Sequence, residues 1–302
     1  MVHFLTLKDY SREEILSLIS KAIKYKRTPQ SSISFSGKSI ALIFEKPSTR
    51  TRASMAVAAY QIGVFPITYN WSELQLGRGE PIKDTARVLS RYHDAIAARV
   101  YFHNVLEELA EYASVPVINM LSNLFHPLQA LADFMTIFEK FGGFKDVKIA
   151  FVGDGRDNVL NSLLIIANKL GVEIRIASPR EYWPTENFLN EIGCRAVTIT
   201  EDPIEAIDGA NVIYTDVFVS MGQESEREKR LKDFLPSYQV NDRLVRFADQ
   251  NFIFMHCLPA KRNEEVTDSV IEDVQHSVVW DQAENRLYTA KAVLSKLIYE
   301  NI

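Results

Sequence analysis

The sequence of 302 residues has little of what marks an extracellular, membrane or nucleic-acid-binding protein. Its two cysteines, Cys194 and Cys257, form neither a CxxC pair nor a disulfide framework, as expected in a reducing cytoplasm. Apolar runs stay short of the ~18 residues that a membrane span needs. The first residues also lack the pattern of a signal peptide. With 34 Lys and Arg against 39 Asp and Glu, the net charge of -5 argues against nucleic acid or an anionic membrane as partner. We therefore expect a cytoplasmic protein.

The sequence also lacks complete nucleotide and metal motifs. Gly37-Lys38-Ser39 has the end of a P-loop, but Ser32 stands where the first glycine is required. Gly153-Asp-Gly155 begins a dinucleotide fingerprint whose last glycine is replaced by Asn158. The six histidines lack metal-ligand spacing. These departures exclude a P-loop NTPase, disfavour a nucleotide-binding dehydrogenase and predict no metal site.

Short apolar runs alternate with helical patterns along the chain. Ser11-Arg-Glu-Glu14 has the form of a capping box before an amphipathic helix. Buried runs separated by helices are typical of parallel strands in βαβ units. They lie at 39–44, 95–100, 115–120, 147–152, 172–177, 211–214 and 251–255. We expect an α/β protein with two doubly wound parallel-sheet domains.

The helix predicted at 127–141 marks the domain boundary, because it ends at Gly142-Gly143 and a new strand follows. We assign residues 1–132 to the first domain and 133–282 to the second. The C-terminal helix, within 283–302, is expected to pack back on the first domain. In open parallel sheets, ligands bind beyond the carboxyl ends of the strands. The active site is therefore expected in the cleft between the domains, at residues that follow strands.

Several such segments carry candidate site residues. Ser48-Thr-Arg-Thr-Arg52 opens a helix, where backbone N–H groups, the helix dipole and guanidinium groups suit an anion. Arg99 ends a strand, and His126 and Gln129 share the first turn of a helix. The others are Asn158, Asp216-Val-Phe-Val-Ser220-Met221-Gly222 and His256-Cys257-Leu258-Pro259. Taken singly, each has an ordinary alternative, such as a helix cap, a structural ion pair or a buried inert thiol.

Together, and in this order, the segments resemble the aspartate/ornithine carbamoyltransferase family over nearly the whole chain. Ser48-Thr-Arg-Thr-Arg52 and His126-Pro-x-Gln129 resemble the carbamoyl-phosphate motifs that the family shares. Asp216-x-x-x-Ser220-Met-Gly222, His256-Cys-Leu-Pro259 and Ala283-Glu-Asn-Arg286 resemble the ornithine-specific members. The aspartate-specific members carry His-Pro-Leu-Pro and lack the Ser-Met-Gly loop.

The resemblance implies transfer of a carbamoyl group from carbamoyl phosphate to the δ-amine of L-ornithine, which gives L-citrulline and phosphate. The route is arginine biosynthesis or the catabolic arginine deiminase pathway, and no metal or organic cofactor is called for. The implied carbamoyl-phosphate site comprises Ser48, Thr49, Arg50, Thr51, Gln75, Arg99, His126, Gln129, Cys257, Leu258 and Arg286. The implied ornithine site comprises Asn158, Asp216, Ser220 and Met221. The implied catalytic residues are Arg50, Arg99, His126, Asp216 and Cys257.

Two structural features are implied as well. Gln75 would reach into the site of a neighbouring subunit, so the protein would be a homo-oligomer, a trimer or an assembly of trimers. The Leu258–Pro259 bond would be cis, with the carbonyl groups of Cys257 and Leu258 accepting from the carbamoyl NH2.

Three positions depart from the family pattern: Asp157, where many relatives have Asn, Asn123, where many have Asp, and Phe218, where many have Trp. Two alternatives stay open. One is a carbamoyltransferase for putrescine, N-acetylornithine or aspartate, and the other is a catalytically silent protein that binds carbamoyl phosphate.

Overall fold

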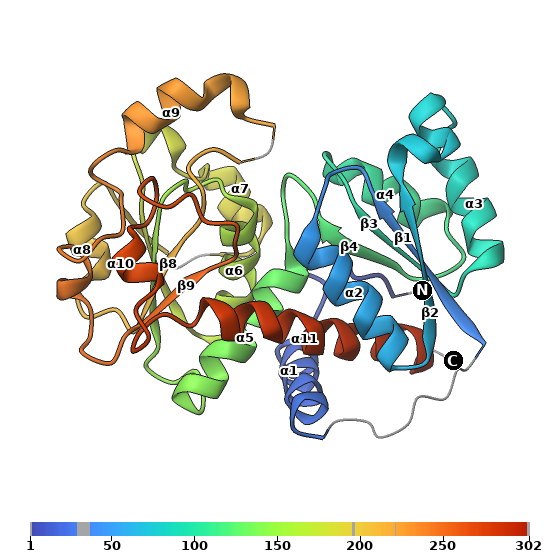
Figure 1. The fold of residues 1–302 in the computed structure, drawn as a ribbon, viewed down its shortest axis with the longest axis horizontal. Coiled ribbons are helices and arrows are strands. Elements are labelled where there is room, and N and C mark those ends of the chain that lie inside the picture. Colours follow the sequence, from blue (N-terminus) through green and yellow to red (C-terminus); the bar gives the residue numbers. More distant parts are fainter. Residues whose placement is uncertain (1, 29–36, 195–196, 221, 301–302) are drawn as a thin grey trace. The chain divides into compact units, whose positions relative to one another are not determined.

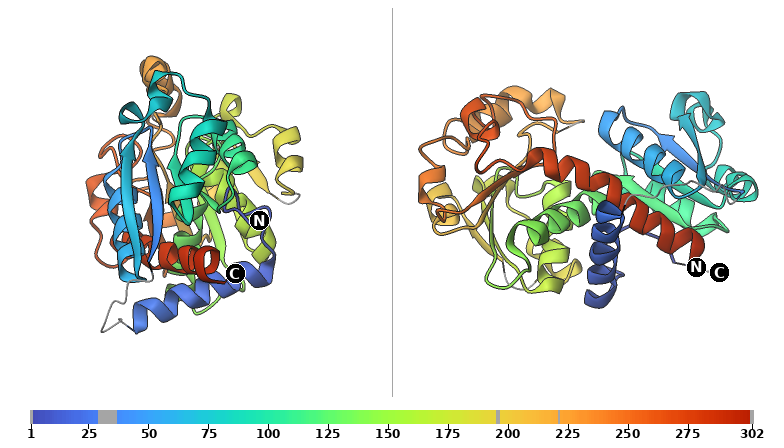
Figure 2. Two further views of the ribbon diagram at one scale, coloured as in Figure 1. Left: turned by 90° about the vertical axis from the view of Figure 1, so that its right-hand side faces the viewer. Right: turned by 60° about the horizontal axis from the view of Figure 1, so that its bottom comes forward.

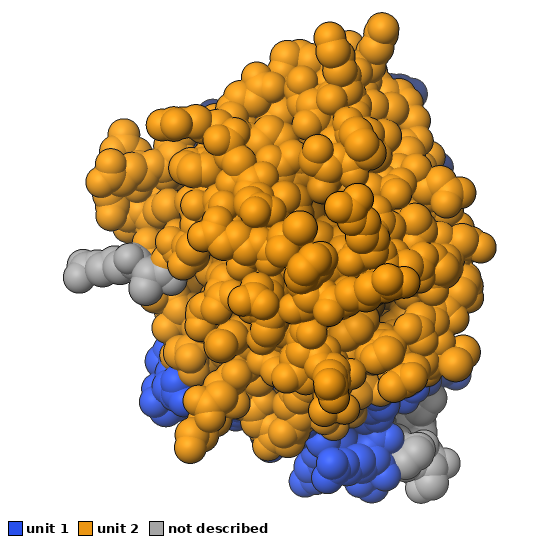
Figure 3. Space-filling view, turned by 90° about the vertical axis from the view of Figure 1, so that its left-hand side faces the viewer, with its two compact units in different colours: residues 1–135, 284–302 blue, residues 136–283 orange. Residues whose placement is uncertain are grey.

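The computed structural model describes residues 2–28, 37–194, 197–220 and 222–300 (Figure 1). The chain forms two compact units, the first made of residues 1–135 with 284–302 and the second of residues 136–283 (Figure 3). The chain passes from one unit to the other inside α5 (Pro127–Phe141) and again inside α11 (Val279–Tyr299). None of the described helices combines the length and the apolar character of a membrane span.

The first unit contains a parallel four-stranded sheet of order β2-β1-β3-β4. Its strands are β1 (Lys38–Phe44), β2 (Val64–Asn70), β3 (Ala95–Arg99) and β4 (Val117–Leu121). Its other helices are α1 (Arg12–Arg27), α2 (Thr49–Gln61), η1 (Trp71–Glu73), η2 (Gln75–Arg78), α3 (Ile82–Tyr92) and α4 (His103–Tyr112). Every residue of β3 and β4 is buried, as expected for parallel strands that are covered on both faces.

The second unit contains a parallel five-stranded sheet of order β7-β6-β5-β8-β9. Its strands are β5 (Lys148–Val152), β6 (Glu173–Ala177), β7 (Thr198–Thr200), β8 (Val212–Thr215) and β9 (Ile253–His256). Its other helices are α6 (Asn158–Leu170), η3 (Arg180–Tyr182), α7 (Glu186–Glu191), α8 (Pro203–Ile207), η4 (Glu224–Glu226), α9 (Arg227–Phe234), η5 (Val245–Phe247) and α10 (Asp268–Ile271).

Each sheet has a switch point, where the chain turns from one side of a strand to the other. In the first unit it lies between β1 and β3, and in the second between β5 and β8. Crevices outside the carboxyl ends of such strand pairs are the usual ligand sites of open α/β sheets. The fold therefore directs attention to the segments that follow these four strands.

Several predicted elements are confirmed. The capping box forms, because Ser11 Oγ accepts from the N–H of Glu14 at 3.1 Å and the Glu14 carboxylate accepts from the N–H of Ser11 at 2.9 Å. Helix α5 has the predicted bounds. The final helix packs on the first unit (Figures 1 and 2). Lys296 of this helix pairs with Glu14 of α1 at 2.8 Å.

Other predicted elements differ from the structure. The sequence patterns did not predict β2 and β7, which are edge strands. Strand β2 contains Pro66 and is only partly buried, and β7 is three residues long. Helix α11 starts at Val279, earlier than the predicted start at 283. Most residues of β2 and β7 are exposed or half-buried, so their apolar patterns are weak, whereas the edge strands β4 and β9 are fully buried and were predicted.

Candidate active site

The first cluster begins at the N-terminus of α2, directly after β1. Ser48 caps the helix, and its Oγ accepts from the N–H of Thr51 at 3.2 Å. The first backbone N–H groups of a helix have no partner within it and, with the dipole, favour a bound anion. Thr51 is buried, Ser48 and Arg50 are half-buried, and Thr49 is exposed. Arg52 instead donates to Asn70 Oδ1 at 2.6 Å.

Arg286 connects this helix start to two other helices of the first unit. Its Nη2 donates to Thr51 Oγ1 at 3.0 Å, and its Nη1 donates to Gln129 Oε1. The amide nitrogen of Gln129 donates in turn to Asp133 Oδ1 at 2.8 Å. Arg286, Gln129 and Asp133 are all buried. The network fixes a positive charge and a carboxamide beside the N-terminal end of α2.

His126 and Arg99 belong to the same cluster. Burial lowers the pKa of His126 well below its usual range, and the positive charges of Arg286 and Arg99 lower it further. The imidazole is therefore neutral, and it can donate one hydrogen bond without adding charge. Arg99, at the end of β3, is buried too. Two guanidinium groups and a neutral imidazole thus lie together, as suits a substrate with an anionic group and a polar carbonyl.

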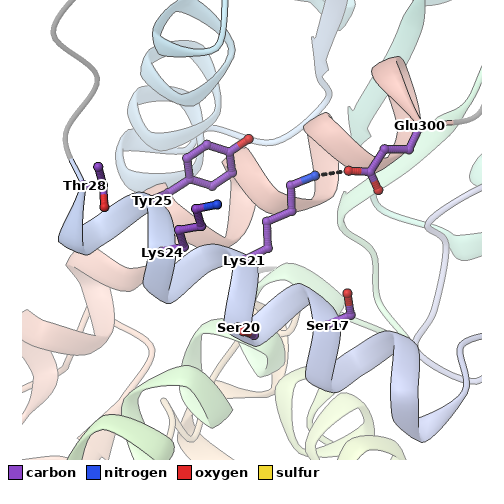
Figure 4. Close-up of a pocket in the computed structure, with 7 residues that line it drawn as sticks. All are labelled: Ser17, Ser20, Lys21, Lys24, Tyr25, Thr28 and Glu300. Carbon is purple, nitrogen blue, oxygen red and sulfur yellow. Dashed lines mark hydrogen bonds and ion pairs between the residues drawn. The ribbon is translucent and has the colours of Figure 1, made fainter.

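Gln75 does not join this cluster. It is exposed on η2, and its side chain makes no hydrogen bond to the cluster within the described residues. A hollow on α1 contains none of the candidate site residues (Figure 4). It is lined by Ser17, Ser20, Lys21, Lys24, Tyr25, Thr28 and Glu300.

The second cluster lies at the ends of β8 and β9 in the second unit. These strands are neighbours, with Thr215 opposite His256. One side-chain atom each from Asp216, His256 and Cys257 lies within 4.8 Å of the others. Burial raises the pKa of Asp216, although His256 and a hydrogen bond with the Cys257 thiol lower it. A buried carboxyl with a raised pKa is a stronger base than a solvated one.

His256 links this pair to a buried glutamate. Its Nδ1 accepts from the N–H of Leu258 at 2.9 Å, so Nε2 carries the proton and donates to Glu265 Oε1 at 3.1 Å. Glu265 also accepts from the N–H of Lys261. His256 and Glu265 are fully buried. Both ring nitrogens are therefore engaged, and a metal ion at this thiol, imidazole and carboxylate set would have to displace one partner.

The hydrogen bond from Leu258 fixes an unusual backbone. Leu258 has φ of 59°, in the left-handed region that side chains rarely adopt. The Leu258–Pro259 bond is cis, which confirms the prediction. The backbone of Cys257 and Leu258 is thus held in one arrangement beside Asp216.

The segment after β5 supplies Asp157 and Asn158. Asp157 caps α6 and accepts from the N–H groups of Val159 at 2.8 Å and Leu160 at 3.0 Å. Burial raises the pKa of Asp157 well above its ordinary range, and the Asp216 carboxylate raises it further. Asn158 is half-buried at the first turn of α6. The two carboxyl groups therefore sit close enough to interact across the switch point of the second sheet.

The remaining candidates lie in the loop after β8. Ser220 is half-buried, and its N–H donates to Gln223 Oε1 at 2.9 Å. Met221 lies outside the described residues. Gly155, from the dinucleotide-like segment, has a packing role: a Cβ there would stand 2.7 Å from the Tyr182 carbonyl oxygen. That close approach accounts for glycine without a bound nucleotide.

Sequence reasoning missed several buried charged residues in these clusters. Lys46 lies between β1 and α2, with Nζ 4.3 Å from the centroid of the Tyr101 ring. Asp133 and Glu265 orient Gln129 and His256. The helical spacing of Gln129 and Asp133 was a signal for the first pair. Glu265 had none, because it lies in a charged run that resembles solvated surface.

The two units define a two-domain α/β protein with a cluster of buried guanidinium groups and a neutral imidazole in one unit and a thiol–carboxylate cluster in the other. Residues 2–139 match the family model of the aspartate/ornithine carbamoyltransferase carbamoyl-P binding domain. Residues 145–297 match that of the Asp/Orn binding domain. The chain therefore belongs to the aspartate/ornithine carbamoyltransferase family, as the motifs predicted.

Named relatives match over almost their full lengths. The ornithine carbamoyltransferase of Hyperthermus butylicus is 56% identical over 304 residues, which cover 97% of this chain and 96% of that protein. The anabolic ornithine carbamoyltransferase of Pyrococcus furiosus is 51% identical over 300 residues, with 96% and 94% covered. A solved structure of ornithine carbamoyltransferase from Pyrococcus furiosus has a TM-score of 0.91 at 50% identity, with 99% of this chain and 97% of that chain covered. The enzyme from Thermus thermophilus has a TM-score of 0.89 at 42% identity, with 97% and 98% covered. The predicted fold class of two parallel-sheet α/β domains is confirmed.

Proposed function

We propose that the chain has ornithine carbamoyltransferase activity and transfers the carbamoyl group of carbamoyl phosphate to the δ-amine of L-ornithine. The products are L-citrulline and phosphate. The observation that carries the proposal is the pairing of the buried Asp216 carboxyl with the half-buried Cys257 thiol beside the switch point of the second sheet. The names of the full-length relatives support the same two substrates. In the reaction a nitrogen–carbon bond forms, the carbon–oxygen bond to phosphate breaks and the amine loses a proton.

Carbamoyl phosphate binds mainly to the first unit in this proposal. The phosphate group takes the start of α2, with contacts from Ser48, Thr49, Arg50, Thr51 and Arg99. The carbamoyl group lies against His126, Gln129 and Arg286. Negative charge grows on the carbonyl oxygen as the amine attacks, and fixed donors stabilise it without having to reorganise. Loss of one such donor costs on the order of 100-fold in rate in comparable acyl transfers.

The amine is activated in the second unit. A free alkylamine with a pKa near 10.4 is neutral to only about 0.04% at pH 7, so the site has to remove a proton. Asp216 is the base, because burial raises its pKa toward the range in which a carboxylate accepts protons well. The Cys257 thiol hydrogen-bonds to it and stands at the reacting centre. Asn158, Ser220 and Met221 bind the amino-acid end of ornithine.

The fixed backbone after β9 orients the other side of the carbamoyl group. The carbonyl oxygens of Cys257 and Leu258 accept from its NH2. Their direction depends on the hydrogen bond from the N–H of Leu258 to His256, which Glu265 anchors. Correct orientation of the reacting groups contributes a large part of enzymatic rate enhancement.

The proposal also covers the oligomeric assembly, the limits of the two domains and the cellular compartment. Gln75 contributes to carbamoyl-phosphate binding in a neighbouring copy of the chain, and its exposure on η2 is compatible with this role. The working unit is then a homo-oligomer, a trimer or an assembly of trimers. Residues 1–132 with 283–302 form the carbamoyl-phosphate domain and 133–282 the ornithine domain. Cys257 carries a thiol that is not part of a disulfide, and this suits a reducing cytoplasm.

Carbamoyl transfer by the purified chain, followed as phosphate release for every amine and as citrulline for L-ornithine, tests the proposal. Carbamoyl phosphate is supplied with L-ornithine and, in parallel, with L-aspartate, putrescine or N-acetylornithine. Turnover with ornithine alone is expected. Turnover with another amine would overturn the amine assignment and keep the carbamoyl-phosphate site, whereas carbamoyl-phosphate binding without turnover would favour a silent binding protein. Asp216→Asn, similar in size, is the matched variant that should lose turnover but retain carbamoyl-phosphate binding by calorimetry.

A further inference from the structure

Arg230 is a charged side chain held inside the second unit. It lies on α9 in a strongly charged segment, yet only 4% of its side chain is exposed. Its guanidinium carbon is 4.7 Å from the centroid of the Tyr182 ring. A buried guanidinium is unfavourable unless it is paired and hydrogen-bonded. Its partners therefore indicate which segments it fixes in place.

Two segments outside α9 supply the hydrogen-bond partners of Arg230, and the exposed Glu226 of η4 adds an ion pair to Nη1 at 3.8 Å. Nη2 forms an ion pair with the carboxylate of Asp154, which follows β5 and is also buried. Nε donates to the carbonyl oxygen of Phe218, in the loop after β8, at 2.6 Å. Asp154 further accepts from the N–H of Arg156 at 2.8 Å, which fixes the turn before α6. One guanidinium therefore joins the two segments that flank the switch point of the second sheet.

Phe218 stands at the middle of the segment that carries the amine-site candidates. It lies two residues after Asp216 and two before Ser220. Its ring is 1% exposed and stacks on Phe234 of α9, with centroids 4.7 Å apart and an interplanar angle of 10°. Helix α9 thus holds both the carbonyl group and the ring of Phe218, and the backbone of 216–220 is fixed at its midpoint.

We propose that Arg230 is a positioning residue for the amine substrate, and that it acts through Asp154 and the main chain of Phe218 to fix the segment 216–220. The proposal rests on the proposed function, because it assigns that segment to the amine. Arg230 itself touches neither reactant in this role. Its loss should therefore weaken the use of ornithine and leave carbamoyl-phosphate binding intact, since the carbamoyl-phosphate motifs 48–52 and 126–129 belong to the other unit.

Arg230→Lys separates positioning from simple charge neutralisation. Lysine keeps a positive charge for Asp154, but a single ammonium group cannot reproduce the rigid donor geometry of a guanidinium that bonds in two directions. We expect R230K to fold, to raise KM for L-ornithine about tenfold or more, and to leave the Kd for carbamoyl phosphate unchanged. Arg227→Lys is the matched control, because it makes the same exchange at an exposed position of the same helix. It should behave as the wild type.

Hydrogen exchange of the amides of 217–220 gives a second readout that needs no turnover. R230K should exchange faster there and at the wild-type rate in β5. If the wild type did not use ornithine, the proposed function would fail, and the exchange rates would still test the positioning role. Should R230K not fold, Asp154→Asn gives the same measurements with the guanidinium retained, and both effects are expected again. A folded variant with the wild-type KM for L-ornithine and wild-type hydrogen exchange would overturn the proposal. Equal losses in ornithine use and in carbamoyl-phosphate binding would overturn it as well.

Discussion

Asp157→Asn tests the buried acid at the start of α6. Asp157 is 6% exposed and accepts from the N–H groups of Val159 and Leu160. Its pKa is raised well above the ordinary range, first by burial and then by the Asp216 carboxylate. Asparagine accepts the same two hydrogen bonds through Oδ1, and the two residues cap helices about equally well. The substitution thus removes a titrating proton and keeps the helix cap.

The sign of the effect follows from proton linkage. A carboxyl whose pKa is higher in the folded state than in the unfolded chain binds its proton more tightly when folded. Its contribution to stability is complete below the unfolded pKa of about 3.9 and is lost as the pH rises through the folded pKa. Between these two values the wild type loses about 1.4 kcal/mol per pH unit relative to D157N. Above the folded pKa of Asp157 the difference becomes constant.

Urea unfolding of wild type and variant from about pH 4 to about pH 9 measures this difference. Tryptophan fluorescence, to which Trp183 and Trp280 of the same unit contribute, reports the transition. Asp202→Asn is the control: Asp202 is an exposed cap of α8 that accepts from the N–H of Ile204 at 2.9 Å, so it gives the effect of the exchange without burial. A difference between D157N and wild type that stays constant over the whole pH range would refute the reasoning.

Three further substitutions test the two clusters. Arg50→Ala should abolish carbamoyl-phosphate binding and leave the fold intact, because Arg50 is half-exposed; unchanged affinity by calorimetry would contradict the anion site at α2. Cys257→Ser should reduce ornithine-dependent turnover more than carbamoyl-phosphate binding, and equal losses would make Cys257 structural. Arg286→Met removes the donors to Thr51 and Gln129, and hydrogen bonds from a charged group contribute about 1.5–3 kcal/mol each. Its Kd for carbamoyl phosphate should rise at least about tenfold by calorimetry, and a wild-type Kd would place Arg286 outside the site.

Elements with strong local signals could be predicted from the sequence. Helix α5 has Pro127 at its first position and Gly142 directly after its last turn, so both ends are marked. The cap at Ser11 is local for the same reason. Strands β2 and β7 had no such signal, since most of their residues are exposed or half-buried, unlike those of the edge strands β4 and β9.

The clusters themselves depend on contacts that sequence spacing does not reveal. Arg286 reaches Thr51 across 235 positions, and only the family resemblance brought the two into one site. Arg230 lies in a charged run that reads as a solvated helix face, although the fold buries it against Asp154. A charged residue can be buried when an oppositely charged partner is already buried at that place, and here the partner follows a distant strand.

Asp157 shows how a departure from a family pattern can preserve the physics of a site. The family pattern that the sequence resembles has asparagine here, a neutral group with one acceptor oxygen and one donor group. A protonated aspartic acid has nearly the same shape, also offers a carbonyl oxygen and an O–H donor, and carries no charge. Burial and the neighbouring Asp216 carboxylate raise the pKa of Asp157, so they favour this neutral form. Asp157, whose pKa is raised the more strongly, is the member of the pair that keeps its proton, and in the proposed reaction this leaves Asp216 as the ionised base. While that proton stays bound, Asp157 is as neutral as the asparagine of the family pattern, so the difference in sequence makes little difference to the charge of the site.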